Sequence, residues 1–173
     1  MSHFAALIVR TGRGWKGADI DIDDAADIEE VADLLRDAAI DDGPVVMFVE
    51  EDDEWFGVVR VDGNNDPKVF ISDARMVAVS PLAMTLFADL ASDEIADESE
   101  ALAEDEDILA DDDEQPSVKP AAEPSGAAGL LADFGLPDAD LLAMCAEEGA
   151  LPADVITGIC ERLGCAEEIE VYR

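Results

Sequence analysis

The clearest pattern of apolar and polar positions lies in Val45–Val61, where two apolar, β-branched runs flank five acidic residues, Glu50–Glu54. This pattern predicts a β-hairpin with a charged loop. The second run has large apolar side chains at consecutive positions, so a strand there is apolar on both faces. Because such a strand is normally covered on both faces, we expect the hairpin to be central in a sheet flanked by helices. One face would carry Trp55, Val59 and Val61, and the other Phe56 and Val58.

The residues before this hairpin predict a second hairpin and a helix. The expected strands are Phe4–Val9 and Ala18–Asp23, joined by a glycine-rich turn over Thr11–Gly17. Apolar residues then recur at helical spacing, which predicts a helix over Asp24–Ile40. Asp23 or Asp24 would be its N-cap.

The residues after the central hairpin complete the first domain. We expect a turn over Asp62–Pro67, a strand over Val69–Ile71, and a helix that begins at Ser80–Pro81, with serine as the cap. Residues 74–79 give no clear assignment. Residues 1–90 therefore predict the order β-β-α-β-β-β-α, an α+β domain on a mainly antiparallel sheet.

The second half of the chain divides into a linker and a small apolar unit. In residues 91–125 Asp, Glu, Ala, Ser and Pro dominate, so we expect an acidic, disordered linker. Residues 126–173 predict helices over Asp138–Glu148 and Pro152–Leu163 and a short strand over Glu167–Tyr172. Because so short a unit has a marginal core of its own, it should dock on the first domain and cover one face of its sheet.

Charge narrows the choice of partners. Ten basic residues face 44 acidic ones, which gives a formal net charge of −34. Because phosphate binding needs clustered lysine and arginine, this balance argues against direct nucleic-acid binding. Three interpretations of the acidity stay open: solubility through self-repulsion, an acidic surface for a basic partner, and mimicry of nucleic acid.

The apolar runs and the cysteines of the sequence predict where in the cell the protein is found. No run of about 18 apolar residues is present, so we expect no membrane span, and the short apolar N-terminal stretch predicts a strand rather than a signal peptide. The odd number of cysteines predicts reduced thiols and a cytoplasmic location. Two of them fall on apolar helical faces, which favours buried thiols over a zinc site. The cysteines are Cys145, Cys160 and Cys165.

Two motifs imitate ligand-binding patterns without their context. Gly12–Gly17 matches G-x-G-x-x-G, but a strand rather than a helix is expected directly after it, so we interpret it as a hairpin turn. Four residues fit a calcium-loop spacing, but Pro67 stands where that loop needs glycine. These four are Asp62, Asn64, Asp66 and Asp73. The sequence thus predicts no catalytic residues, no metal and no cofactor.

Two groups of residues are the candidates for contact with a partner. The first is the densest basic cluster of the chain, for which contact and simple solvation both stay open. The second is the acidic loop of the central hairpin with the tryptophan that follows it. The candidate residues are Arg10, Arg13, Trp15 and Lys16 in the first group, and Glu50, Glu51, Asp52, Asp53, Glu54 and Trp55 in the second.

Five stretches together carry a family resemblance: Phe4–Trp15, Phe48–Phe56, Val59–Gly63, Phe70–Ala74 and Cys145–Asp154. With them the chain resembles the actinobacterial family of tRNA adenosine deaminase-associated proteins. The resemblance covers both folded segments and skips the linker. It implies an encoded neighbour that converts adenosine to inosine in tRNA, and it transfers no catalytic residues to this chain.

The chain is not expected to be the deaminase itself. A zinc deaminase needs a His/Cys/Cys metal set, a catalytic glutamate and a basic substrate surface. This sequence lacks the H-x-E and P-C-x-x-C signatures and has the opposite charge. We therefore expect a non-enzymatic accessory protein that binds or regulates a tRNA adenosine deaminase. The alternatives are an acidic nucleic-acid mimic and a general protein-interaction module.

Overall fold

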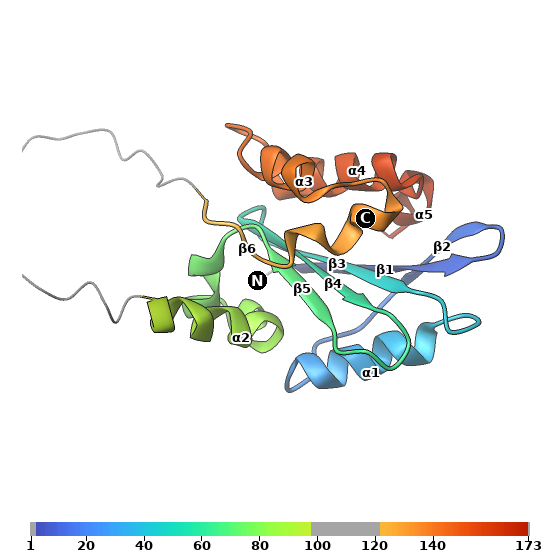
Figure 1. Ribbon diagram of the computed structural model, residues 1–173, viewed down its shortest axis with the longest axis horizontal. Helices are drawn as coiled ribbons and strands as arrows, with labels where there is room; N and C mark the ends of the chain where they lie inside the picture. Colours follow the sequence, from blue (N-terminus) through green and yellow to red (C-terminus); the bar gives the residue numbers. More distant parts are fainter. Residues whose placement is uncertain (1–2, 98–121, 173) are drawn as a thin grey trace, which may run out of the picture.

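The computed structural model describes residues 3–97 and 122–172. They form an antiparallel sheet in the order β2-β1-β3-β4-β5-β6. Its strands are β1 (His3–Thr11), β2 (Gly14–Asp19), β3 (Val45–Glu51), β4 (Trp55–Val61), β5 (Lys68–Ile71) and β6 (Ser125–Gly126). The α-helices are α1 (Ile28–Ala38), α2 (Pro81–Asp97), α3 (Asp138–Cys145), α4 (Pro152–Leu163) and α5 (Ala166–Glu170), and the 3₁₀ helices are η1 (Ala74–Ala78) and η3 (Ala128–Phe134). Helices α1 and α2 lie on one side of the sheet and the C-terminal helices on the other (Figure 1), which confirms the α+β class.

The hairpin of β3 and β4 is central, as predicted. β3 pairs with β1 and β4 pairs with β5, so neither strand lies at an edge. Trp55, Val59 and Val61 belong to the core under α1 and α2. Phe56 and Val58 belong to the core under the C-terminal helices. Both faces of the hairpin are therefore covered, each by a different part of the chain.

The core under α1 and α2 is closed by a phenylalanine that fills the space above a glycine. The Phe87 ring of α2 lies where a Cβ atom on Gly57 of β4 would stand. The same ring meets Trp55 edge-on, with ring centroids 5.9 Å apart. Phe87 has non-helical backbone angles (φ −131°, ψ 21°), so α2 is kinked at this contact.

Element boundaries near the N-terminus differ from the prediction. β2 begins at Gly14 rather than Ala18, because two residues suffice to connect Thr11 with its partner Gly14. α1 begins after Asp27, whose carboxylate accepts a hydrogen bond from the Glu30 N–H at 3.0 Å. Several aspartates here are equivalent caps by composition, and packing of the helix on the sheet decides among them.

Two further differences lie in the second half of the chain. The predicted strand Glu167–Tyr172 is largely helix α5, because Gly164 ends α4 in the left-handed conformation and the chain turns to bury Ile169. Both ends of the segment 91–125, predicted as a linker, contain regular structure, since α2 runs to Asp97 and Ser125 pairs with β5 through β6. Residues 98–121 of that linker lie outside the described residues. The unassigned residues 74–79 contain η1.

We expect the substitution Phe56→Ala to lower the free energy of unfolding by about 3–5 kcal/mol. Phe56 is only 2% exposed and packs with the C-terminal layer, so its loss leaves a cavity between two layers. Urea denaturation measures the change. The control is Val171→Ala, at a position 77% exposed, which should stay within about 0.5 kcal/mol. Equal stability of the two variants would mean that the core lies elsewhere.

Candidate functional site

The two candidate contact groups lie at opposite ends of the sheet. The basic group surrounds the β1–β2 turn, whereas Glu50–Glu54 connects β3 with β4. Register fixes their separation, because β1 places Phe4 against Glu50 and Val9 against Val45. Figure 1 shows the β1–β2 turn projecting at one end and the chain end near His3 at the other. The two groups therefore cannot form one contact surface.

Trp15 of the basic group holds the C-terminal unit in place. Its side chain is 9% exposed, and its Nε1 donates a hydrogen bond to the Leu163 carbonyl at 2.9 Å. The Arg10 guanidinium lies over the indole, 5.0 Å from the ring centroid. Arg13 and Lys16 are exposed. Of the basic group, only the three cations remain available at the surface.

The acidic loop is a tight turn of which Asp52–Glu54 are exposed. Asp52 and Asp53 both have left-handed backbone angles, with φ of 51° and 56°. The Glu54 N–H donates to the Glu51 carbonyl at 3.0 Å, and the Asp53 N–H donates to Glu50 Oε1 at 2.9 Å. Aspartate tolerates this conformation better than most residues. The exposed residues Asp52–Glu54 are called the acidic tip below.

Glu51 and Trp55 form the buried base of this acidic tip. Glu51 is 6% exposed and Trp55 fully buried. Glu51 Oε2 accepts hydrogen bonds from Trp55 Nε1 at 2.9 Å and from Ser80 Oγ at 2.5 Å. Ser80 Oγ in turn accepts from the Ala83 N–H at 3.1 Å, which caps α2 as predicted. The positive end of the α2 dipole further stabilises the Glu51 carboxylate.

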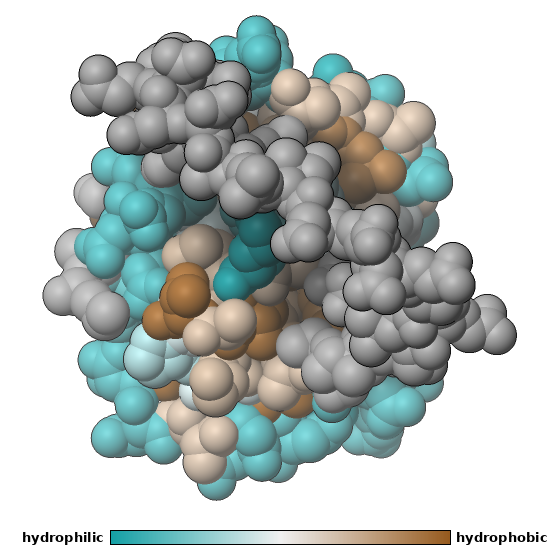
Figure 2. All heavy atoms as spheres, turned by 90° about the vertical axis from the view of Figure 1, so that its left-hand side faces the viewer, coloured by the Kyte–Doolittle hydropathy of each residue, from teal (hydrophilic) through white to brown (hydrophobic). Residues whose placement is uncertain are grey.

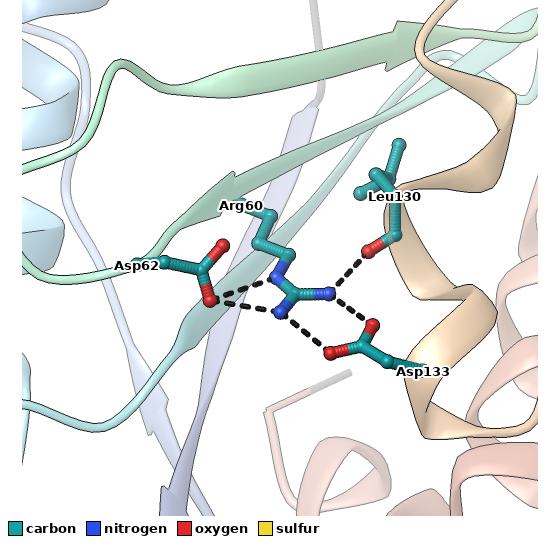
Figure 3. A network of polar contacts seen from close by, with 4 residues as sticks. All are labelled: Arg60, Asp62, Leu130 and Asp133. Carbon is teal, nitrogen blue, oxygen red and sulfur yellow. Dashed lines mark hydrogen bonds and ion pairs between the residues drawn. The ribbon is translucent and has the colours of Figure 1, made fainter.

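A second buried charge joins the C-terminal unit to β4. Arg60 is 7% exposed, and its Nη1 donates to the Leu130 carbonyl at 2.6 Å and to Asp133 at 2.5 Å (Figure 3). Its Nη2 donates to Asp62 and Asp133, each at 2.8 Å. The guanidinium also lies over the Phe134 ring, 4.3 Å from its centroid. The sequence signal for this network was a single arginine inside an apolar strand, which the prediction did not use.

The network shifts the pKa values of its members. Burial alone would lower the pKa of Arg60, but hydrogen bonds to Asp133 and Asp62 outweigh it and raise the pKa. The hydrogen bond from Arg60 lowers the pKa of Asp133 below its ordinary value. Arg60 and Asp133 are therefore both charged at neutral pH, and their ion pair joins β4 to the C-terminal unit.

The residues of the rejected motifs have other roles. Asp62 binds Arg60, and Asp73 binds Arg75, so two of the four residues in calcium-loop spacing are engaged in ion pairs. Cys160 and Cys165 are buried, and burial raises the pKa of Cys145 to about 11. Among the side chains that the structure describes, in residues 3–90 and 122–172, no three His, Cys, Asp or Glu are grouped as metal ligands.

A small cavity of about 100 Å³ lies between the end of α1 and the turn after β4. Its lining residues include Arg36, Asp42 and Asn64. This volume is well below the roughly 300–1,000 Å³ of typical small-molecule sites. This cavity is therefore too small for a typical small-molecule ligand.

Comparison with known proteins identifies a family. The family model described as Rv3753c-like tRNA adenosine deaminase-associated protein matches residues 3–166. Neither the curated proteins nor the solved structures contain a significant match. In the part of the chain that the structure describes, no helix is long and apolar enough to cross a membrane.

We expect Glu51→Ala to lower the free energy of unfolding by about 1–3 kcal/mol, because it leaves the buried donors of Trp55 and Ser80 without their acceptor. Chemical denaturation measures this loss. Glu54→Ala, in the exposed part of the same turn, is the matched control and should stay within about 0.5 kcal/mol. A Glu51→Ala protein as stable as the control would show that the network does not stabilise the fold.

We expect Asp133→Asn to destabilise the protein at pH 7 and to lose this effect in acid. The folded-state pKa of Asp133 is lowered, so the ion pair stabilises fully above the ordinary aspartate pKa of about 3.9. That contribution disappears as pH falls through the folded-state pKa. Denaturation at several pH values compares the wild type with this variant and with Asp66→Asn, at an exposed turn position. A gap that is unchanged in acid would contradict the assignment.

Proposed function

The chain belongs to the Rv3753c-like tRNA adenosine deaminase-associated protein family, and we propose on this basis that it is a non-enzymatic accessory protein that binds a tRNA adenosine deaminase. The match over residues 3–166 is the observation that carries the proposal. In this proposal the complex forms in the cytoplasm between two folded proteins. Its formation regulates the editing of adenosine to inosine in tRNA.

Charge supports a protein partner of this kind. An enzyme that acts on tRNA must present a cationic surface to a polyanion, because phosphate contacts dominate affinity for nucleic acids. This chain carries a net charge of −34. Each of four arginines is already paired with an aspartate in the described residues, which leaves the surplus carboxylates to set the outer field. Complementary charge speeds encounter and selects against wrong partners.

The small number of histidines supports an accessory role, because a zinc deaminase needs a His/Cys/Cys metal set. The one histidine of the chain is His3, whose Nε2 lies 3.1 Å from the Asp23 carboxylate. The nucleic-acid mimic, the alternative derived from the sequence, was motivated by the acidic loop beside Trp55 and Phe56. Both aromatic side chains are buried, so they offer no stacking surface and mimicry would depend on the carboxylates alone.

We expect the tagged full-length protein to co-purify the deaminase from its native host at low salt, and to retain less of it in about 1 M salt, where the Debye length is about 3 Å. Mass spectrometry of both eluates measures the enrichment. An unrelated tagged protein of similar net charge is the control for non-specific ionic capture. Absence of the deaminase at both salt concentrations would contradict the proposed function.

A further inference from the structure

Two exposed apolar side chains belong to the segment that is hydrogen-bonded to the base of the acidic tip. Val79, at the end of η1, is 68% exposed, and Met84, in the first turns of α2, is 53% exposed. Ser80 follows Val79 directly and donates to Glu51 Oε2, and Asp52 follows Glu51. One hydrogen bond thus joins the segment that carries Val79 and Met84 to the turn that carries the acidic tip, although the two are distant in sequence.

Hydrogen bonds hold the backbone at Val79 and Met84 in place. The Val79 N–H donates to the Met76 carbonyl at 3.1 Å, and the Met84 N–H donates to the Ser80 carbonyl at 2.9 Å. Ser80, between these positions, is 3% exposed and is bound on both sides. The backbone that carries Val79 and Met84 therefore belongs to the same network as the base of the acidic tip.

Figure 2 shows the side of the molecule at which α2 ends. Apolar and hydrophilic side chains both line the hollow that is visible there. The partly buried Met76 and Leu82 adjoin the exposed pair in sequence and pack on the core beneath. Apolar centres with polar rims are the usual anatomy of protein interfaces, in which methionine is enriched.

We propose that Val79 and Met84, bordered by the acidic tip Asp52–Glu54, form a docking surface for a basic protein surface that has an apolar depression. The proposal rests on the proposed function, and it names the face through which this chain contacts the deaminase. Charge complementarity selects this occupant. Nucleic acid would be repelled by the acidic tip, and a second copy placed symmetrically would bring two acidic tips together.

The test compares paired variants of the full-length protein for binding to purified deaminase. Val79→Ser with Met84→Gln removes the apolar pair, and Asp52→Asn with Asp53→Asn removes charge while keeping side chains that tolerate the left-handed turn. The apolar control is Val171→Ser with Leu142→Gln, which are exposed on the C-terminal unit. The charge control is Asp41→Asn with Asp42→Asn, whose backbone is left-handed as well but lies near the opposite end of the sheet.

We expect the apolar variant to bind about tenfold more weakly or worse, which corresponds to about 1.4 kcal/mol. The charge variant should bind more weakly at low salt and show a smaller dependence on salt. Both controls should bind as the wild type does. Thermal unfolding of all four variants, measured beside binding, shows whether each one keeps its fold. Isothermal titration calorimetry at two salt concentrations gives both quantities.

Four outcomes decide between the proposals. Loss of binding in both test variants but neither control supports the docking surface. If the wild type binds the deaminase and both test variants bind equally well, the proposed docking surface is wrong and the proposed function is unaffected. Failure of the wild type to bind the deaminase overturns the proposed function, and the docking surface with it; self-association abolished by the apolar variant would instead assign this face to a second copy.

Discussion

The two-sided apolar strand β4 is the constraint on which the rest of this structure depends. All of its residues, from Trp55 to Val61, are buried. One covering layer can shield only one face of a sheet, so the chain must supply a second layer. Helices α1 and α2 provide the first, and the chain returns after residue 121 to provide the other. The C-terminal unit is therefore part of the same fold as the sheet, and its core is shared with Phe56 and Phe70.

The single charge inside β4 sets how the second layer is placed. A guanidinium buried between layers is costly unless its donors are satisfied. Arg60 meets this demand with Asp62, which directly follows β4, and with Asp133 and the Leu130 carbonyl from η3. Because these bonds are directional, the network favours a docking geometry in which η3 meets the donors of Arg60. Trp15 adds a second fixed point through Leu163.

The buried carboxyl group of Glu51 connects the core of the fold with the proposed docking surface. Glu51 cannot reach a partner directly, yet it holds the β3–β4 turn against the start of α2. Through it, an acidic loop and exposed apolar residues more than twenty positions away become neighbours. The basic β1–β2 turn, at the far end of the sheet, is separate from this face. The two ends of the sheet therefore carry different chemistry: exposed cations at the β1–β2 turn, and the acidic tip at the β3–β4 turn.

The sequence by itself determined the α+β class, the central position of the Val45–Val61 hairpin and the side chains on each of its faces, because alternation and apolar density report burial directly. It also determined the cap of α2, which follows from local Ser-Pro chemistry. Only the tertiary structure decided the start of α1 among several aspartates, the helical state of residues 166–170, and the pairing of β6 with β5, since each depends on contacts distant in sequence. The same holds for the candidate site. Its acidic residues stood out in the chain, but the burial of Glu51 and Trp55, and the approach of Val79 and Met84, arise from a hydrogen bond between segments 29 residues apart.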